Sequence, residues 1–203
     1  RIRRHAGPKN FGNAVDAVGL VWTNYYRPRN NRPRLHVRTT RAPMTPGILR
    51  ADGLTKRYRS RTAVDNMDLS VDEGQVYGLL GPNGSGKTTS ILMFMGLTEP
   101  TSGTATVCGF DPLRDPLSVK RLASYLPESV GFYTDLTARQ NLRYTADLND
   151  VARSEAQQRI DQLLDQVGLT DDADRQVGQF SRGMKQRLGI ADSLVKRPRV
   201  AFF

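Results

Sequence analysis

The sequence has few residues of the kinds that mark disulfide-stabilised or membrane-spanning proteins. Among its 203 residues there are one cysteine, one tryptophan and two histidines. The single cysteine, Cys108, excludes an internal disulfide and favours a reducing compartment. The longest unbroken apolar run, 91–95, is far shorter than the roughly 20 residues of a transmembrane helix. We therefore expect any membrane association to come through a partner.

Acidic residues are nearly absent from the front of the chain. Residues 1–43 hold ten Lys/Arg and one acid, Asp16, whereas residues 44–203 hold the other 20 Lys/Arg and 19 acids. The net charge of +10 therefore belongs almost wholly to the first 43 residues. Because the remainder is nearly neutral, we do not expect a nucleic-acid partner for it.

Residues 1–43 are rich in Arg, Pro and Asn, and their apolar positions follow neither helix nor strand spacing. A basic arm that contacts nucleic acid or anionic lipid is one interpretation, and an Arg-rich targeting peptide is a second. The sequence starts with Arg1, and Met44 stands just before the first segment that looks like a domain. This favours a third interpretation, an upstream or disordered extension that is dispensable.

A glycine-rich loop is the most specific feature of the sequence. Residues 81–88 match the phosphate-loop pattern G-x-x-x-x-G-K-[ST] at every fixed position. The apolar run 76–80 before it is typical of a buried parallel strand, and the stretch 88–97 after it is typical of a helix. The predicted nucleotide contacts of this loop are Gly81, Pro82, Asn83, Gly84, Ser85, Gly86, Lys87, Thr88 and Thr89.

Each residue type in the loop suits the binding of a triphosphate. Backbone N–H groups of a tight loop offer many donors, and glycines let phosphate approach the backbone. We expect Lys87 to reach the β- and γ-phosphates and the Thr88 hydroxyl to bind Mg²⁺. A glycine-rich turn before a core helix is the alternative, and the flanking segments weigh against it. ATP and Mg²⁺ are therefore the predicted cofactors.

Together with this loop, several segments at matching distances resemble the ATP-binding subunit of ABC transporters over about residues 48–203. Three segments with strand spacing resemble the family's antiparallel β-subdomain: 49–58, 66–74 and 101–109. Two segments with helical spacing, 136–148 and 160–167, resemble its helical subdomain, which we place at about 129–183. The resemblance implies an α/β fold, with these subdomains on a P-loop NTPase (RecA-like) core, and a partial domain at 44–203.

Tyr58 and Val64 occupy positions that the resemblance assigns to the base. Tyr58 lies 23 residues before Gly81, where the family has an aromatic ring that stacks on adenine. Val64 is expected to flank the base beside it. An ordinary half-exposed strand aromatic is the alternative for Tyr58.

Glu128 stands where the family has the Q-loop glutamine, which touches Mg²⁺ or the attacking water. It follows a predicted short helix at 118–122. An ionised carboxylate can bind Mg²⁺ but cannot donate a hydrogen bond, so Glu128 is predicted as a metal contact. The variant Tyr-Leu-Pro-Glu at 125–128 resembles a subgroup of exporters whose ATPase and membrane subunits are separate chains. A glutamate in a surface loop is the alternative.

The segment 177–188 resembles the family's signature sequence. Ser181 and Gly183 match its Ser-Gly-Gly core, whereas Arg182 replaces the first glycine and Met184 replaces the usual glutamine. A hydroxyl and free N–H groups at the start of the predicted helix 184–195 form an anion site. The resemblance implies that this site contacts the γ-phosphate held by a second ATP-binding subunit.

The last residues, 199–203, are expected to form a parallel strand. In the family this strand ends in an Asp that supports Mg²⁺, followed by a glutamate that polarises the attacking water and a later histidine that contacts the γ-phosphate. No residue follows Phe203, and the histidines, His5 and His36, precede the domain. We therefore expect a C-terminally incomplete domain with no complete catalytic set, which binds ATP but hydrolyses it poorly. We also expect exposed apolar surface at 200–203.

Three functional hypotheses follow. The resemblance favours an ATP-binding subunit that drives a separate membrane-spanning transporter subunit from the cytoplasmic side and works as a dimer. A soluble ABC-type ATPase of translation or DNA repair is the second, although such proteins usually carry two cassettes or long inserts. A non-catalytic nucleotide-binding module is the third. The transported substrate cannot be read from these residues.

Overall fold

Three antiparallel strands form the first sheet of the computed structural model, which describes residues 47–59 and 61–203. The predictions for residues 1–43 therefore lie outside the described residues. The strands β1 (Leu49–Tyr58), β2 (Arg61–Val71) and β3 (Ser102–Val107) are ordered β2-β1-β3. Apolar residues alternate with polar ones in β2, where Met67, Leu69 and Val71 are buried. This alternation predicted the strand, and the prediction is confirmed.

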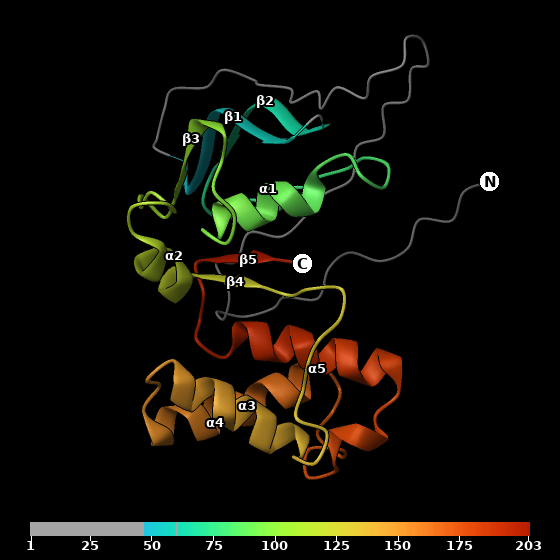
Figure 1. Cartoon of the computed structure of the whole chain (residues 1–203). Coiled ribbons are helices and arrows are strands. Elements are labelled where there is room, and N and C mark those ends of the chain that lie inside the picture. The colour runs from blue at the N-terminus through green and yellow to red at the C-terminus, as the bar shows by residue number, and fades with distance from the viewer. Residues whose placement is uncertain (1–46, 60) are drawn as a thin grey trace, which may run out of the picture.

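The helix α1 (Lys87–Phe94) lies between that sheet and a pair of short parallel strands, β4 (Ala123–Tyr125) and β5 (Val200–Phe202) (Figure 1). Apolar side chains from both sheets and from α1 form one hydrophobic core. The rings of Phe94 and Phe202 stack with centroids 6.1 Å apart, which joins α1 to β5. A short helix, α2 (Pro116–Leu122), leads into β4. This arrangement fixes α1, and hence the loop before it, on the first sheet.

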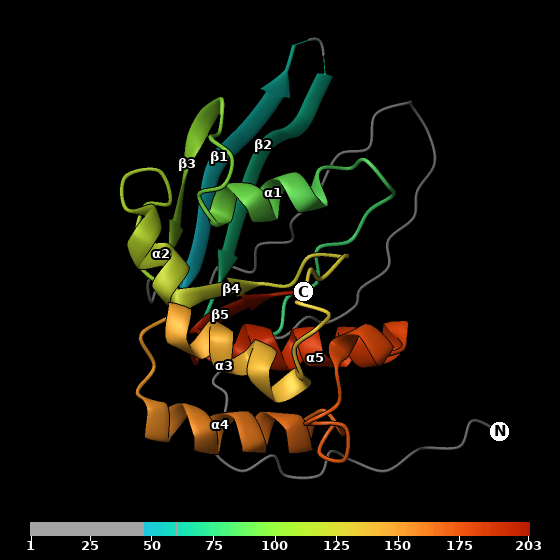
Figure 2. The same cartoon turned by 60° about the horizontal axis from the view of Figure 1, so that its bottom comes forward.

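A second hydrophobic core holds the helical part together. It comprises α3 (Ala138–Leu148), α4 (Arg153–Gln166), the turn η1 (Val177–Gln179) and α5 (Arg182–Leu194). In α4 three residues of the predicted apolar spacing, Ile160, Leu163 and Leu164, are buried, whereas Val167 follows the helix and is half-buried. Gly168 comes next, with φ 63°. Figure 2 shows these helices on the side of β4 and β5 that faces away from α1. α5 approaches the chain after β4 closely at Gly189, where a Cβ would lie 2.7 Å from Leu126 Cδ1.

The parallel strand expected at 199–203 is present as β5, but two other expectations are wrong. Residues 76–80 form no strand, and Val76 and Leu80 are each 40% exposed. A parallel strand needs ladder hydrogen bonds from a neighbour, and no described strand lies in register with this run. At the chain's end, Val200 and Ala201 are buried rather than exposed, because β5 pairs with β4 in the first core. Only Phe203, at 46% exposure, agrees with the expectation.

The predicted helices agree with the structure in type and differ at their ends. The helix after the glycine-rich loop was predicted at 88–97 and spans Lys87–Phe94, and Gly96 follows it at φ 63°. The helix predicted at 184–195 starts two residues earlier, at Arg182. Within the described residues, no helix has both the length and the hydropathy that a bilayer crossing requires.

Candidate functional site

The glycine-rich loop ends at Gly86, which caps the N-terminus of α1. Gly86 has φ 93° and ψ 3°, a left-handed conformation that side chains other than glycine adopt at a cost. A Cβ on this residue would lie 2.2 Å from the backbone oxygen of Ala63 in β2. The loop therefore lies directly on β2, and only glycine fits at this position.

The N-terminus of α1 keeps its backbone donors free for a ligand. Gly86 has no side chain to accept from the first turn, and that turn contains no acidic residue. The first helix-type bond in this region runs from the Ser90 amide to Gly86 O at 2.8 Å, so the earlier amides have no helical acceptor. Amides and the helix dipole together favour an anion here.

Lys87 lies folded back over the loop. Its Nζ donates to Gly81 O at 2.7 Å and to Pro82 O at 3.0 Å. Both acceptors are neutral carbonyls, whereas an ammonium forms stronger hydrogen bonds to anionic oxygens such as phosphate. The ammonium is thus held over the loop by partners that an anion can replace.

The other predicted residues of the loop lie together at its surface. Pro82, Asn83 and Thr88 are exposed, and Thr89 is half-buried in the first turn of α1. The Ser85 hydroxyl is buried and has no hydrogen-bond partner among the described residues. An orphaned buried hydroxyl inside a glycine-rich loop fits a site that a polar ligand completes.

Arg61 is a residue of the loop region that the sequence analysis missed. Its Nη2 donates to Gly84 O at 2.9 Å from the start of β2. Arg61 belongs to no motif, and the signal that finds it is the strand register, in which Arg61 pairs with Tyr58. Two cations, Lys87 and Arg61, therefore hold the loop by its carbonyl oxygens.

Tyr58 and Val64 lie near the loop in different environments. Tyr58 is 47% exposed at the end of β1, with Lys56 Nζ 5.0 Å from its ring centroid. Val64 is buried, and its Cγ2 lies 3.0 Å from the place a Cβ on Gly86 would take. The structure thus leaves the ring of Tyr58 open to solvent and places Val64 beneath the loop.

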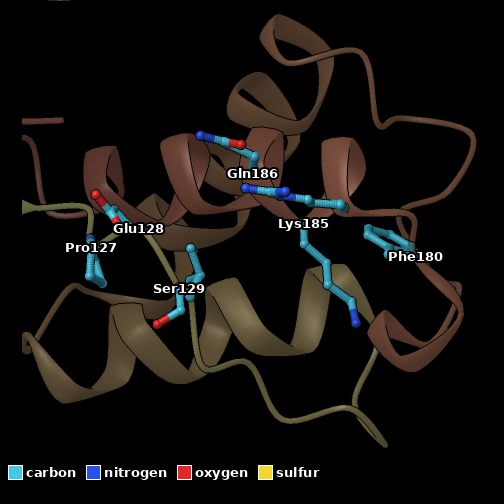
Figure 3. Close-up of a pocket in the computed structure, with 8 residues that line it drawn as sticks. Pro127, Glu128, Ser129, Phe180, Lys185 and Gln186 are labelled. Carbon is cyan, nitrogen blue, oxygen red and sulfur yellow. The ribbon is translucent and has the colours of Figure 1, made fainter.

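Glu128 lies in the segment after β4 and lines a cavity of about 430 Å³. Figure 3 shows Pro127, Glu128 and Ser129 on that segment, opposite Phe180, which precedes α5, and Lys185 and Gln186 in α5. The carboxylate is exposed and takes part in no ion pair among the described residues. The structure therefore brings Glu128 together with the signature segment.

The signature segment forms the start of α5. Ser181 caps this helix, and its hydroxyl accepts a hydrogen bond from the Met184 amide at 3.3 Å. Gly183 is exposed, and a Cβ on it would meet no atom within 4 Å. Ser181 and Gly183 are thus both at the surface, at a helix N-terminus that the Ser181 side chain caps.

The most strongly desolvated charges lie at the other end of α5. Burial raises the pKa of Asp192, although a hydrogen bond from Thr145 and the nearby Lys196 oppose that shift. Burial also lowers the pKa of Lys196, whose ammonium donates to Lys120 O. The Lys196 hydrogen bond joins the chain just after α5 to α2.

The fold and the loop define a class of protein. A glycine-rich loop with a left-handed glycine at the N-cap of a helix, with a lysine at the next position, is the arrangement of a P-loop NTPase. The family model described as ABC transporter matches residues 64–203, which is more than half of the chain, so the chain belongs to the ABC transporter family.

Individual proteins show the same likeness. The bacitracin transport ATP-binding protein BcrA of Bacillus licheniformis is 41% identical over 153 residues, covering 75% of this chain and 49% of that protein. The daunorubicin resistance ATP-binding protein DrrA2 of Streptomyces coeruleorubidus is 41% identical over 154 residues, 76% of this chain and 48% of that protein. The chain thus spans about half the length of these relatives.

A solved structure described as an ATP-binding subunit of an ABC transporter has the same fold. It matches with a TM-score of 0.70 and 28% identity, over 76% of this chain and 64% of that one. The predicted α/β P-loop fold and the predicted family are therefore confirmed.

Proposed function

We propose that this chain binds Mg-ATP at the loop 81–89 and forms the ATP-binding part of an ABC transporter. One observation carries the proposal: Gly86 opens α1 without a side-chain cap while Lys87 lies over the loop on exchangeable carbonyls. Backbone donors, the helix dipole and a cation then converge where a triphosphate is most negative. The family match and the names of the relatives support the same function.

In this proposal different residues bind the phosphates, the Mg²⁺ ion and the base of the nucleotide. The amides of the loop and Lys87 bind phosphate oxygens, the Thr88 hydroxyl holds Mg²⁺, and Tyr58 stacks on the base. Mg²⁺ neutralises phosphate charge when it is bound, and it commonly takes few protein ligands beside the phosphates and water. Glu128 contributes a second, carboxylate contact to the ion. No group of three or more His, Cys, Asp or Glu within 47–59 and 61–203 is placed to hold a metal.

A direct binding measurement tests this function. Lys87→Ala is expected to weaken Mg-ATP binding tenfold or more, which corresponds to about 1.4 kcal/mol. Lys120→Ala is the matched control, because Lys120 lies in the last turn of α2 and is not part of the loop 81–89. Titration calorimetry on the three proteins gives the three dissociation constants. Equal affinity in the original chain and Lys87→Ala would refute the assignment.

We also propose that the chain works with a membrane-spanning transporter subunit on the cytoplasmic side, and with a second ATP-binding subunit. The relatives named for bacitracin transport and daunorubicin resistance support this role, and they favour export. The start of α5, exposed at Ser181 and Gly183, is the surface that would face the second subunit's nucleotide. Sedimentation with Mg-ATP is expected to show dimers, and a monomer at every concentration would contradict the second subunit.

We further propose that a polypeptide of these 203 residues turns ATP over slowly. Hydrolysis needs a group that orients water in line with the leaving oxygen. The sequence holds no acid after Asp192, and Glu128 is assigned to the ion rather than to the water. Steady-state phosphate release is therefore expected near background. Rapid release that Lys87→Ala abolishes would show that the residues present suffice.

A further inference from the structure

We infer that Arg61 is a second cation for the nucleotide, which binds the phosphate nearest the nucleoside. This inference rests on the proposed function, because it adds a residue to the same site. It starts from an unassigned contact, the 2.9 Å hydrogen bond from Arg61 Nη2 to Gly84 O.

The strand register places Arg61 between the base and the phosphates. Tyr58 and Arg61 are Cα partners at the end of the β1–β2 hairpin, so their side chains leave the sheet on the same face. From there the guanidinium reaches Gly84, in the middle of the phosphate loop. Suppose that the base of a nucleotide lies on Tyr58 and its outer phosphates lie at Lys87. Its innermost phosphate then lies beside the Arg61 guanidinium.

The loop lies close enough to β2 to keep this geometry. Gly86 packs against Ala63 O, two residues along β2 from Arg61, and leaves no room for a Cβ. The β2 strand therefore flanks the loop from Gly84 to Gly86. Because a strand is stiffer than a loop, Arg61 is presented from a fixed base.

The charge of Arg61 is free for an anion. Within 47–59 and 61–203, no carboxylate forms an ion pair with Arg61 or with Lys87. The guanidinium has five N–H donors, and its one hydrogen bond within the described part of the chain goes to a neutral carbonyl. Phosphate is a stronger acceptor than that carbonyl, and Arg matches its geometry. Arg61 therefore exchanges Gly84 O for phosphate when nucleotide binds.

The alternative role is structural, in which Arg61 only braces the loop through Gly84 O. Substitutions that separate hydrogen bonding from charge distinguish the two. Arg61→Gln keeps an N–H donor for the carbonyl and loses the charge, whereas Arg61→Lys keeps the charge. Arg57→Gln is the matched control, because Arg57 is exposed on β1 beside Thr62 and its guanidinium forms no ion pair within 47–59 and 61–203.

The experiment measures dissociation constants for Mg-ATP and Mg-ADP with the full 203-residue chain and these variants. Because Arg61 is exposed, Arg61→Gln is expected to weaken both nucleotides by the same factor, about fivefold. Arg61→Lys is expected to weaken them by at most about twofold, since lysine also binds phosphate. Arg57→Gln is expected to leave both constants unchanged, and thermal melting checks that every variant folds.

Three outcomes would overturn the inference. Unchanged affinity in Arg61→Gln would assign Arg61 to loop bracing or to no role. A loss confined to ATP would place the guanidinium at the outer phosphate. A loss in Arg57→Gln equal to that in Arg61→Gln would reduce the effect to general surface charge. Lys87→Ala, measured beside them, distinguishes failure of this inference from failure of the proposed function. If Lys87→Ala weakens ATP binding and Arg61→Gln does not, only this inference fails. If Lys87→Ala leaves ATP binding unchanged, the proposed function fails.

Discussion

The helices α1 and α5 both begin at a segment that sequence motifs assign to phosphate, yet their first turns differ. At α5 the Ser181 hydroxyl accepts the Met184 amide, so the helix supplies its own cap. At α1 the cap position is Gly86, which has no side chain and lies in a left-handed conformation. At α5 one amide of the first turn is capped by a side chain, whereas α1 has no side-chain cap.

This difference separates two kinds of anion site. Uncapped backbone donors and two cations on carbonyl oxygens suit the α1 site to an anionic ligand. At α5 the Ser181 hydroxyl already accepts the Met184 amide, so an anion there has to compete with that cap. This difference accords with the proposed function, in which the signature segment acts together with a second subunit.

The largest expected effect comes from the same substitution made at the two helix starts. Gly86→Ala places a Cβ 2.2 Å from Ala63 O at φ 93°, so we expect the free energy of unfolding to fall by about 2 kcal/mol or more. ATP binding is expected to be lost with it, because the loop has to leave β2. Denaturant unfolding and calorimetry measure the two effects.

Gly183→Ala is the control for that substitution. A Cβ there meets no atom within 4 Å, and alanine favours a helix, so the free energy of unfolding is expected to rise by up to about 1 kcal/mol. Equal destabilisation by Gly86→Ala and Gly183→Ala would remove the distinction between the two sites.

A smaller effect is expected from removing the cap of α5. Ser181→Ala deletes the acceptor of the Met184 amide, which is expected to lower the free energy of unfolding by about 1 kcal/mol. Affinity of the single chain for ATP is expected to stay the same, because Ser181 lies outside the α1 site. Thermal melting and calorimetry check both parts, and a tenfold loss of affinity would show that the two sites overlap.

Much of the fold was predictable, because the periodicity of buried positions is local. The stripe Ile160, Leu163 and Leu164 predicted α4, and the alternation of Met67 and Leu69 predicted β2. The loop was predictable because phosphate binding fixes the spacing of glycine and lysine in P-loops generally.

The remaining features depend on contacts between distant residues. The run 76–80 has strand composition, but a strand also needs a neighbour for its ladder, which composition does not show. The burial of Val200 follows from pairing with Ala123, far away in the sequence. Arg61 was missed for the same reason, since only the β1–β2 register brings it to Gly84.

Hydrogen exchange at the two helix starts tests the central claim most directly. With the single chain at low concentration, saturating Mg-ATP is expected to slow exchange of the amides at 84–89. The Met184 amide, already bonded to Ser181, is expected to exchange at the same rate with and without nucleotide. Slowing at 182–184 without any change at 84–89 would contradict the account, because nucleotide would then bind at α5 rather than at the phosphate loop.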